Sequence, residues 1–243
     1  MREITSTSNV FIKELIKFYD RKMREAEKKF LIEGYHLVKE ASEANLLEQV
    51  LVVDCKDAIY DVPTIIVTYE IIQKLSKTTN PQPIIGVCKM PNTNKIIGNH
   101  ILILDDVNDP GNLGTLIRSA LGFNVSTIIL SPNTVDCYND KVIRATQGAI
   151  FKVNIIVMDL VDAINEIKKM KISVIGTTLE NSVGLDSLKN LNGYALLLGN
   201  EARGVSKNLL DLCDLNVRIN MNSKLESLNV AVAGSIIMHY LDL

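Results

Sequence analysis

Three polar segments of this 243-residue chain carry side chains that could do chemistry, and each follows an apolar run. The first, DDVNDPGNLGTLIRSALGF at 105–123, holds an amide at Asn112 and a guanidinium at Arg118. Six residues are nearly two helical turns, so these side chains do not share one face squarely, but long side chains can converge on one cleft. The alternative is an ordinary capped helix, with Asp109 as the N-cap and Pro110 at the first helical position.

The second segment is LLLGNEARGVS at 196–206, where a buried strand runs into a polar turn bracketed by glycines. Such a turn exposes backbone donors and acceptors, plus the carboxylate of Glu201, at the edge of a sheet. Glu201 could bind a ligand, or it could hold Arg203 in a structural ion pair. Both interpretations stay open at this point.

The third segment is INMNSKLESLNVAVAGSIIMHYL at 219–241. The small polar residues Ser227 and Asn229 stand at the mouth of an apolar helix. Ser227 could bind a ligand or act only as the helix N-cap. The helix itself carries small residues that allow close packing, namely Ala231, Ala233 and Gly234.

Several other chemistries are disfavoured by what the chain lacks. It contains no Gly-x-Gly-x-x-Gly and no Walker P-loop, which argues against nicotinamide dehydrogenases, P-loop NTPases and methyltransferases with Rossmann-type cofactor loops. Its cysteines form no Cys-x-x-Cys pair, so buried thiols are expected, and its histidines are too scattered for a metal ligand set. The cysteines are Cys55, Cys88, Cys137 and Cys213, and the histidines are His36, His100 and His239.

The elements that must position the three segments alternate along the second half of the chain. Continuous apolar strands separated by helices predict a mostly parallel sheet, buried on both faces, in a domain at 100–243. Strands are expected at 101–106, 126–130, 153–158, 172–178, 194–199 and 215–220, and helices at 112–122, 141–147, 160–169, 207–212 and from about 227.

Residues 1–90 show a different texture and predict a smaller α/β domain, joined by a linker at 91–99 that is rich in Pro, Asn, Gly and Lys. One long helix is expected at 9–29. The other elements are strands at 30–34, 48–54, 64–68 and 83–90 and helices at 35–45 and 70–77.

Composition limits the class of protein but gives little direct support for a nucleic-acid partner. Hydrophobic residues make up 47% of the chain, yet no apolar run approaches the roughly 18–20 residues of a membrane helix. The N-terminus lacks the apolar core of a signal peptide, so we expect a cytoplasmic protein without a membrane partner. The net charge is −2, and only 17–29 is locally basic, with six basic and three acidic residues. That stretch alone could be a solvated helix face.

Taken together, the three segments resemble one family, the SpoU (TrmH-type) branch of the SPOUT RNA 2′-O-ribose methyltransferases. DPGNLGTLIRSA is similar to its motif 1, LLLGNEARGVS to motif 2 and VRINMNSKLESLNVAVAG to motif 3. YNDKVIRATQGAIF at 138–151 resembles the segment between motifs 1 and 2. LIEGYHLVKEA, in the first 90 residues, resembles the family's ribosomal-protein-like substrate-binding domain.

The resemblance implies an α/β fold whose C-terminal domain is a trefoil-knotted, mostly parallel sheet with flanking helices, plus a smaller N-terminal α/β domain. It also implies S-adenosylmethionine as cofactor, no metal, RNA as substrate and a homodimer. By motif position, the polar catalytic residues are Asn112, Arg118, Glu201, Ser227 and Asn229. The cofactor-binding residues are Thr177, Leu198, Gly199, Asn200, Gly204, Ile219, Met221 and Leu228. The RNA contacts are expected at Lys13, Lys17, Arg21, Lys22, Arg24, Lys28, Lys29 and Arg144.

Three positions depart from the family pattern: Ala202 where Gly is common, Asn220 where Pro is common, and Ala231 where a second Ser is common. They concern the shape of the cofactor loops, because the polar catalytic set is complete.

The implied reaction is methyl transfer to a ribose 2′-hydroxyl, with ribosomal RNA favoured as substrate. Arginine stays protonated in proteins, which favours Arg118 as a phosphate or ribose clamp over a role as base. Asn112 would orient Arg118 or the hydroxyl, and Glu201 would fix the loop or Arg118. Two alternatives stay open: a transfer RNA substrate, or a non-catalytic RNA-binding assembly factor with the same fold.

Overall fold

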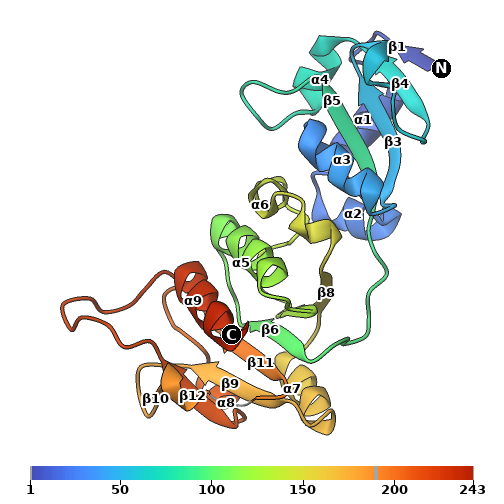
Figure 1. Ribbon diagram of the computed structural model, residues 1–243. Coiled ribbons are helices and arrows are strands. Elements are labelled where there is room, and N and C mark those ends of the chain that lie inside the picture. Colours follow the sequence, from blue (N-terminus) through green and yellow to red (C-terminus); the bar gives the residue numbers. More distant parts are fainter. Residues whose placement is uncertain (1, 189–190, 243) are drawn as a thin grey trace. The chain divides into compact units, whose positions relative to one another are not determined.

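The computed structural model describes residues 2–188 and 191–242, which form two units (Figure 1). The first unit comprises the chain up to Asn92 together with Tyr138–Phe151. The second unit comprises Thr93–Cys137 and the chain from Lys152 onward. The chain first passes from one unit to the other between Asn92 and Thr93, within the stretch predicted as the linker.

The first unit is built on a five-stranded sheet in the order β1-β4-β3-β5-β2. Strands β1, β4 and β3 run parallel, while β5 is antiparallel to both β3 and β2. The strands are β1 (Arg2–Ile4), β2 (Lys29–Glu33), β3 (Leu47–Val52), β4 (Thr64–Val67) and β5 (Ile84–Lys89), and the helices of the N-terminal stretch are α1 (Val10–Lys17), α2 (Arg21–Glu27), α3 (Tyr35–Glu43) and α4 (Tyr69–Leu75).

The single helix predicted at 9–29 is wrong, because two helices occupy this stretch. Helix α1 ends at Lys17, and the side chain of Asp20 then accepts hydrogen bonds from the backbone N–H groups of Lys22 and Met23, which starts α2. Lys28 adopts a left-handed conformation with φ of 54° and ends α2 directly before β2. An N-cap side chain inside an apolar pattern therefore divides the helix.

The segment Tyr138–Phe151 belongs to the first unit, although its sequence lies between two strands of the second. It forms α6 (Asp140–Thr146) and the short 3-10 turn η2 (Ala149–Phe151). The buried ring of Phe30 in β2 lies 4.7 Å from the ring of Tyr138 and 6.3 Å from that of Phe151, centroid to centroid. Two separated stretches of chain thus share one apolar core.

The second unit contains a seven-stranded parallel sheet in the order β10-β12-β9-β11-β6-β7-β8. This confirms the predicted parallel sheet. Its strands are β6 (His100–Leu104), β7 (Thr127–Leu130), β8 (Asn154–Val157), β9 (Ser173–Thr177), β10 (Val183–Gly184), β11 (Tyr194–Leu198) and β12 (Leu215–Arg218), and its helices are α5 (Pro110–Gly122), α7 (Leu160–Lys169), α8 (Lys207–Leu210) and α9 (Val230–Asp242).

Helices cover both faces of this sheet. Ile101, Ile103 and Leu197 pack in one core cluster with the buried face of α7 and with Leu209 of α8. On the other face, α5 packs against α9, where a β-carbon added at Gly234 would lie 2.5 Å from a side-chain carbon of Leu198 and 2.7 Å from one of Leu116. Alternate residues of each buried strand therefore pack into two separate cores, one on each face of the sheet.

This strand order brings the three sequence motifs to one end of the sheet. Parallel pairing aligns Leu104 of β6 with Leu198 of β11, so the loops that carry motifs 1 and 2 leave the sheet side by side. Strand β12, whose second half begins motif 3, pairs with β9 next to β11. The implied trefoil knot stays a prediction. No helix within the described residues is long and apolar enough to cross a bilayer.

Candidate active site

A cavity of about 640 Å³ opens at the carboxyl ends of β9, β11 and β12 in the second unit. We call it the main cavity. It is walled by the loop after β9, the motif 2 turn and the motif 3 loop. All the residues that the resemblance assigned to the cofactor line it, namely Thr177, Leu198, Gly199, Asn200, Gly204, Ile219, Met221 and Leu228.

The motif 2 turn is held in shape by its own polar groups. Asn200 and Gly204 exchange two backbone hydrogen bonds of 3.1 and 2.8 Å, and Gly204 has the left-handed φ of +68° that favours glycine. The side-chain oxygen of Asn200 accepts from the N–H groups of Ala202 and Arg203. A β-carbon at Gly199 would overlap the backbone of Gly204 and Val205, so this wall of the main cavity is bare backbone.

One polar residue from each of the three motifs takes part in a single hydrogen-bonded chain. Asn112 donates through Nδ2 to Oε1 of Glu201 at 3.0 Å, and Oδ1 of Asn112 accepts from Nδ2 of Asn229 at 2.8 Å. The side-chain oxygen of Asn229 in turn accepts from the N–H groups of Ala231 and Val232 at the start of α9. Motifs 1, 2 and 3 are therefore joined through side chains that the sequence analysis singled out.

Glu201 also fixes the beginning of α5. Its carboxylate accepts from the backbone N–H groups of Asn108 at 3.3 Å and Asp109 at 3.1 Å. Partial burial raises the pKa of Glu201, but the hydrogen bonds from Asn112, Asp109 and Asn108 outweigh it, so the pKa lies below its ordinary value. Glu201 is therefore held as an anion that organises the motif 1 loop.

Three local alternatives are decided by these contacts. Asp109 is the N-cap of α5, as predicted, and its side chain accepts from the N–H of Asn112 at 2.8 Å. Arg203 pairs with Asp106 at 3.2 Å and not with Glu201. The C-terminal helix begins at Val230, so its cap is Asn229 and the alternative role of Ser227 as N-cap is wrong. Ser227 is exposed and lines the main cavity.

The remaining catalytic candidate, Arg118, is not joined to this hydrogen-bonded chain. It lies on the exposed side of α5 and makes no hydrogen bond or ion pair with any described residue. Neither Arg118 nor Asn112 lines the main cavity, although Asn112 is linked to it through Glu201 and Asn229. The guanidinium of Arg118 is thus free to meet a substrate.

One structural pair was missed by the sequence analysis. Oδ2 of Asp105 accepts from both the backbone N–H and the hydroxyl of Ser206, each at 2.8 Å. Asp105 follows the last residue of β6 and Ser206 follows the motif 2 turn, so the pair ties motif 1 to motif 2. Two local signals were available in the sequence: a carboxylate directly after a buried strand, and a Ser directly before the start of a helix.

The RNA-contact candidates in the first unit differ in accessibility. Arg24 is wrong as a phosphate contact, because it is only 5% exposed and its guanidinium donates to the carbonyl oxygen of Phe18. Lys29 pairs with Glu48, at 2.8 Å. Arg21 and Arg144 pair with acidic residues four positions away, at 2.7 and 2.8 Å. The exposed candidates are Lys13, Lys17, Arg21, Lys22 and Lys28.

Across residues 2–188 and 191–242, no group of three or more His, Cys, Asp or Glu side chains could hold a metal ion. The polar groups of the site are amides, one carboxylate, one hydroxyl and one guanidinium. Such a set can position a substrate and orient protons, but the electrophile must come from a bound small molecule.

Comparison with known proteins shows the family of the chain. Residues 99–239 match the family model described as the SpoU rRNA Methylase family, and residues 9–86 match the MRM3-like substrate binding domain. The 23S rRNA (guanosine(2553)-2′-O)-methyltransferase RlmP of Bacillus subtilis is 35% identical, over 99% of each chain.

Solved structures agree with these matches. The AdoMet-bound rRNA methyltransferase from Sinorhizobium meliloti is 26% identical, with a TM-score of 0.88 over 99% of this chain and 97% of that one. The SpoU methyltransferase AviRb from Streptomyces viridochromogenes, 22% identical, shares the fold with a TM-score of 0.85 over 96% of this chain and 97% of that one. The chain therefore belongs to the SpoU rRNA methylase family and is an RNA methyltransferase that uses S-adenosylmethionine.

Proposed function

We propose that this chain methylates a ribose 2′-hydroxyl in ribosomal RNA of the large subunit. The substrate of the Bacillus subtilis relative, which matches both units over nearly their whole length, supports this choice over transfer RNA. The observation that carries a catalytic role is the chain of hydrogen bonds from Glu201 through Asn112 to Asn229. It joins three loops beside a cavity of cofactor size. An enzyme with this substrate acts in the cytoplasm, which is the location that we propose.

The volume and the lining of the main cavity suit S-adenosylmethionine. Gly199 presents backbone without a side chain, and Leu198, Ile219 and Leu228 supply apolar walls suited to a flat ring such as adenine. Thr177 is held in place by its hydroxyl, which donates to the carbonyl oxygen of Leu197 at 2.9 Å. When bound, S-adenosylmethionine supplies an electrophilic methyl group.

The chain's own residues position the RNA. Hydrogen bonds of Glu201 and Asn112 fix the start of α5, and Asn229 fixes the start of α9. These contacts hold α5 in place, and α5 carries Arg118. Arg118 would clamp the ribose or a flanking phosphate through its fork of N–H donors. Alignment of the attacking hydroxyl with a methyl donor accounts for most of what a protein can add to such a transfer. The first unit would select the RNA, in line with its match to a substrate-binding domain.

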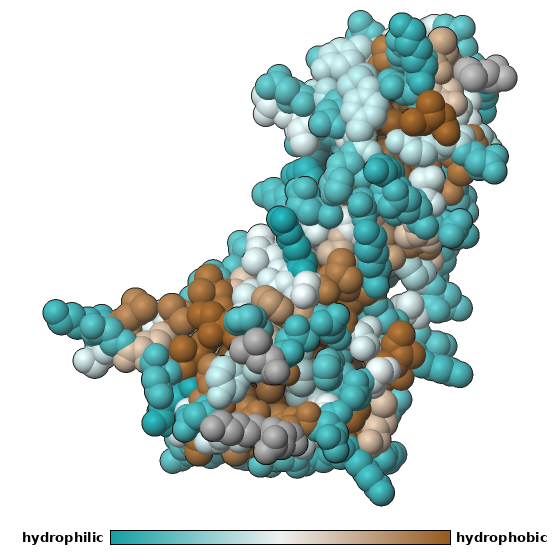
Figure 2. Space-filling view, in the orientation of Figure 1, coloured by the Kyte–Doolittle hydropathy of each residue, from teal (hydrophilic) through white to brown (hydrophobic). Residues whose placement is uncertain are grey.

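A homodimer is part of this proposal. Helices α5 and α9 pack together yet leave Leu121, Val232 and Ile236 between 37 and 48% exposed. Figure 2 shows hydrophobic residues gathered over α9 on the viewed face. A second copy of the chain would bury this apolar surface, and Ile236→Lys should then shift the sedimentation of the protein from dimer to monomer.

Ribose methylation in RNA from cells with and without this chain tests the substrate directly. We expect one 2′-O-methyl group to be lost from 23S ribosomal RNA and to return when the gene is restored. Loss of a transfer RNA methyl group instead would support the alternative substrate. An unchanged methylation map, together with no measurable binding of S-adenosylmethionine, would point to a non-catalytic RNA-binding factor.

A further inference from the structure

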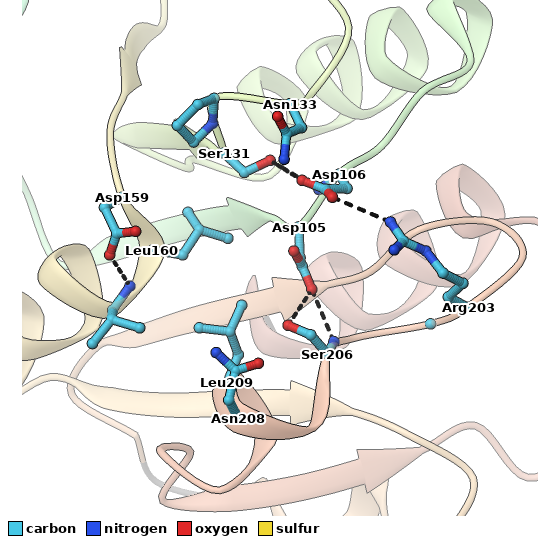
Figure 3. Close-up of a pocket in the computed structure, with 13 residues that line it drawn as sticks. Asp105, Asp106, Ser131, Asn133, Asp159, Leu160, Arg203, Ser206, Asn208 and Leu209 are labelled. Atoms are coloured by element: carbon cyan, nitrogen blue, oxygen red, sulfur yellow. Dashed lines mark hydrogen bonds and ion pairs between the residues drawn. The ribbon is translucent and has the colours of Figure 1, made fainter.

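A second cavity, of about 330 Å³, lies in the second unit across the motif 2 turn from the main cavity (Figure 3). We call it the strand-end cavity. It opens where β6, β7 and β8 end, which is the edge of a parallel sheet at which α/β proteins bind ligands. Arg203 and Gly204 line both cavities, so only the motif 2 turn separates them.

Two carboxylates of this cavity each keep one oxygen free. Asp105 uses Oδ2 to accept from Ser206, and Asp159 uses Oδ1 to accept from the N–H groups of Val161 and Asp162, which caps α7. Among the described residues, no donor reaches Oδ1 of Asp105 or Oδ2 of Asp159. Asp106, by contrast, has both oxygens occupied, one by Ser131 and one by Arg203.

Apart from Arg203, which is paired with Asp106, the rest of the lining is apolar or neutral. Pro132, Leu160 and Leu209 supply apolar walls, and the amides of Asn133 and Asn208 have no hydrogen-bond partner among the described residues. A phosphate would meet carboxylates here, and the described acidic groups do not form a metal site. A neutral, flat molecule with N–H donors on one edge and acceptors on another fits best.

We propose that the strand-end cavity binds a base of the RNA substrate, at or next to the methylated nucleotide, through a donor edge like that of guanine. The free oxygen of Asp105 or of Asp159 can accept from the N1–H or the 2-amino group of guanine, and the O6 and N7 of guanine are acceptors for an amide. Unstacked bases are held in this way in single-stranded RNA, between apolar surfaces and edge-reading polar groups. This inference rests on the proposed function, because it assumes an RNA substrate.

Titration of GMP, IMP, AMP, CMP and UMP into the full-length, isotope-labelled protein tests the proposal by NMR. We expect GMP to shift the side-chain amide signals of Asn133 and Asn208. IMP, which lacks the 2-amino group, should bind several-fold more weakly. Guanosine should bind about as well as GMP, since the cavity offers no phosphate site. A large gain in affinity for GTP would instead mark a free-nucleotide site and overturn the proposal.

Asp159→Asn provides the decisive variant, because asparagine also caps helices well and α7 should persist. We expect it to weaken GMP binding roughly 10-fold. Asp162→Asn removes the same charge from the same helical turn outside the cavity and should leave GMP affinity unchanged. Equal GMP affinity in both variants, or no nucleotide effect on the cavity residues, overturns the proposal. Calorimetric binding of S-adenosylmethionine, measured in parallel, reports on the proposed function independently.

Discussion

The side-chain amide of Asn229 donates to the side-chain oxygen of Asn112 at 2.8 Å, although 117 residues separate them in the chain. The same Asn112 donates to Glu201 through its Nδ2. Its side chain must therefore accept a hydrogen bond from Asn229 on one side and donate one to Glu201 on the other. An amide satisfies both at once, whereas a carboxylate can only accept and an ammonium can only donate.

Replacement of Asn112 by aspartate should therefore harm the enzyme more than replacement by alanine. In Asn112→Asp, a carboxylate oxygen would face Oε1 of Glu201 in place of a donor 3.0 Å away, and the two negative charges would repel. We expect methyl transfer to fall by roughly 100-fold through misplacement of α5. Single-turnover transfer and urea unfolding of both variants at neutral pH check this. Greater stability of the aspartate variant than of the alanine variant would contradict it.

Glu201 predicts a specific pH dependence of stability. Its pKa in the folded protein lies below the ordinary value of 4.5, so the anion stabilises the fold above that value and the contribution disappears as pH falls through the lowered folded pKa. In Glu201→Gln this titration is absent. We expect the difference in unfolding free energy between wild type and variant to be constant near neutral pH and to shrink below about pH 4.5. A difference that grows on acidification would exclude the anionic role.

Local features of this structure could be predicted from the sequence, because their causes are local. The continuous apolar runs at β6 and β11 indicated buried parallel strands, and Asp109 before Pro110 indicated the start of α5. Where two capping residues stand two positions apart, as at Ser227 and Asn229, local pattern does not choose between them. The choice falls on Asn229, which also reaches Asn112.

Long-range features could not be predicted from pattern alone. The amphipathic helix α6 shows which of its faces is apolar but not which core receives that face, and it packs in the first unit with Phe30 nearby. The burial of Arg24 depends on the break between α1 and α2, which turns the guanidinium toward the carbonyl oxygen of Phe18. The resemblance to a family supplied the grouping of the three motifs, which spacing did not.

Gly199→Ala should abolish cofactor binding and destabilise the second unit. The added methyl group would overlap the backbone of Gly204 and Val205, which cannot move without breaking the Asn200–Gly204 pairing. Gly122→Ala is the matched control, because nothing lies within 4 Å of a β-carbon there and alanine in a helix is favoured by about 0.5–1 kcal/mol. Calorimetry should show that Gly199→Ala has lost its affinity for S-adenosylmethionine, and chemical unfolding should show that it is less stable than wild type. Gly122→Ala should show a small gain in stability.

Arg118→Ala should separate transfer from cofactor binding. Since Arg118 is exposed, does not line the main cavity and has no described partner, its removal should leave the fold and the affinity for S-adenosylmethionine unchanged. Single-turnover methyl transfer should fall by a factor of about 100 or more, because a clamp on the ribose or phosphate is lost. Arg118→Lys should recover only part of the rate, since lysine lacks the planar fork of donors. Full transfer by the alanine variant would remove Arg118 from the mechanism.

The exposed lysines of α1 and α2 should carry part of the electrostatic affinity for RNA. In a variant with Lys13, Lys17 and Lys22 changed to alanine, three exposed charges are lost without any described ion pair being broken. Each phosphate contact contributes roughly 0.7–0.9 to the slope of log affinity against log salt, so the slope should become shallower by about 2. Filter binding of 23S rRNA fragments across a salt series measures this.

The control for that variant replaces three exposed lysines of the second unit, Lys169, Lys171 and Lys207, by alanine. It removes the same net charge, so any effect of overall charge on RNA affinity appears equally in both variants. A change in salt slope confined to the α1–α2 variant assigns the phosphate contacts to the first unit. Equal changes in the two would mean that RNA responds to the total charge of the chain, and that recognition by the first unit depends on neutral groups.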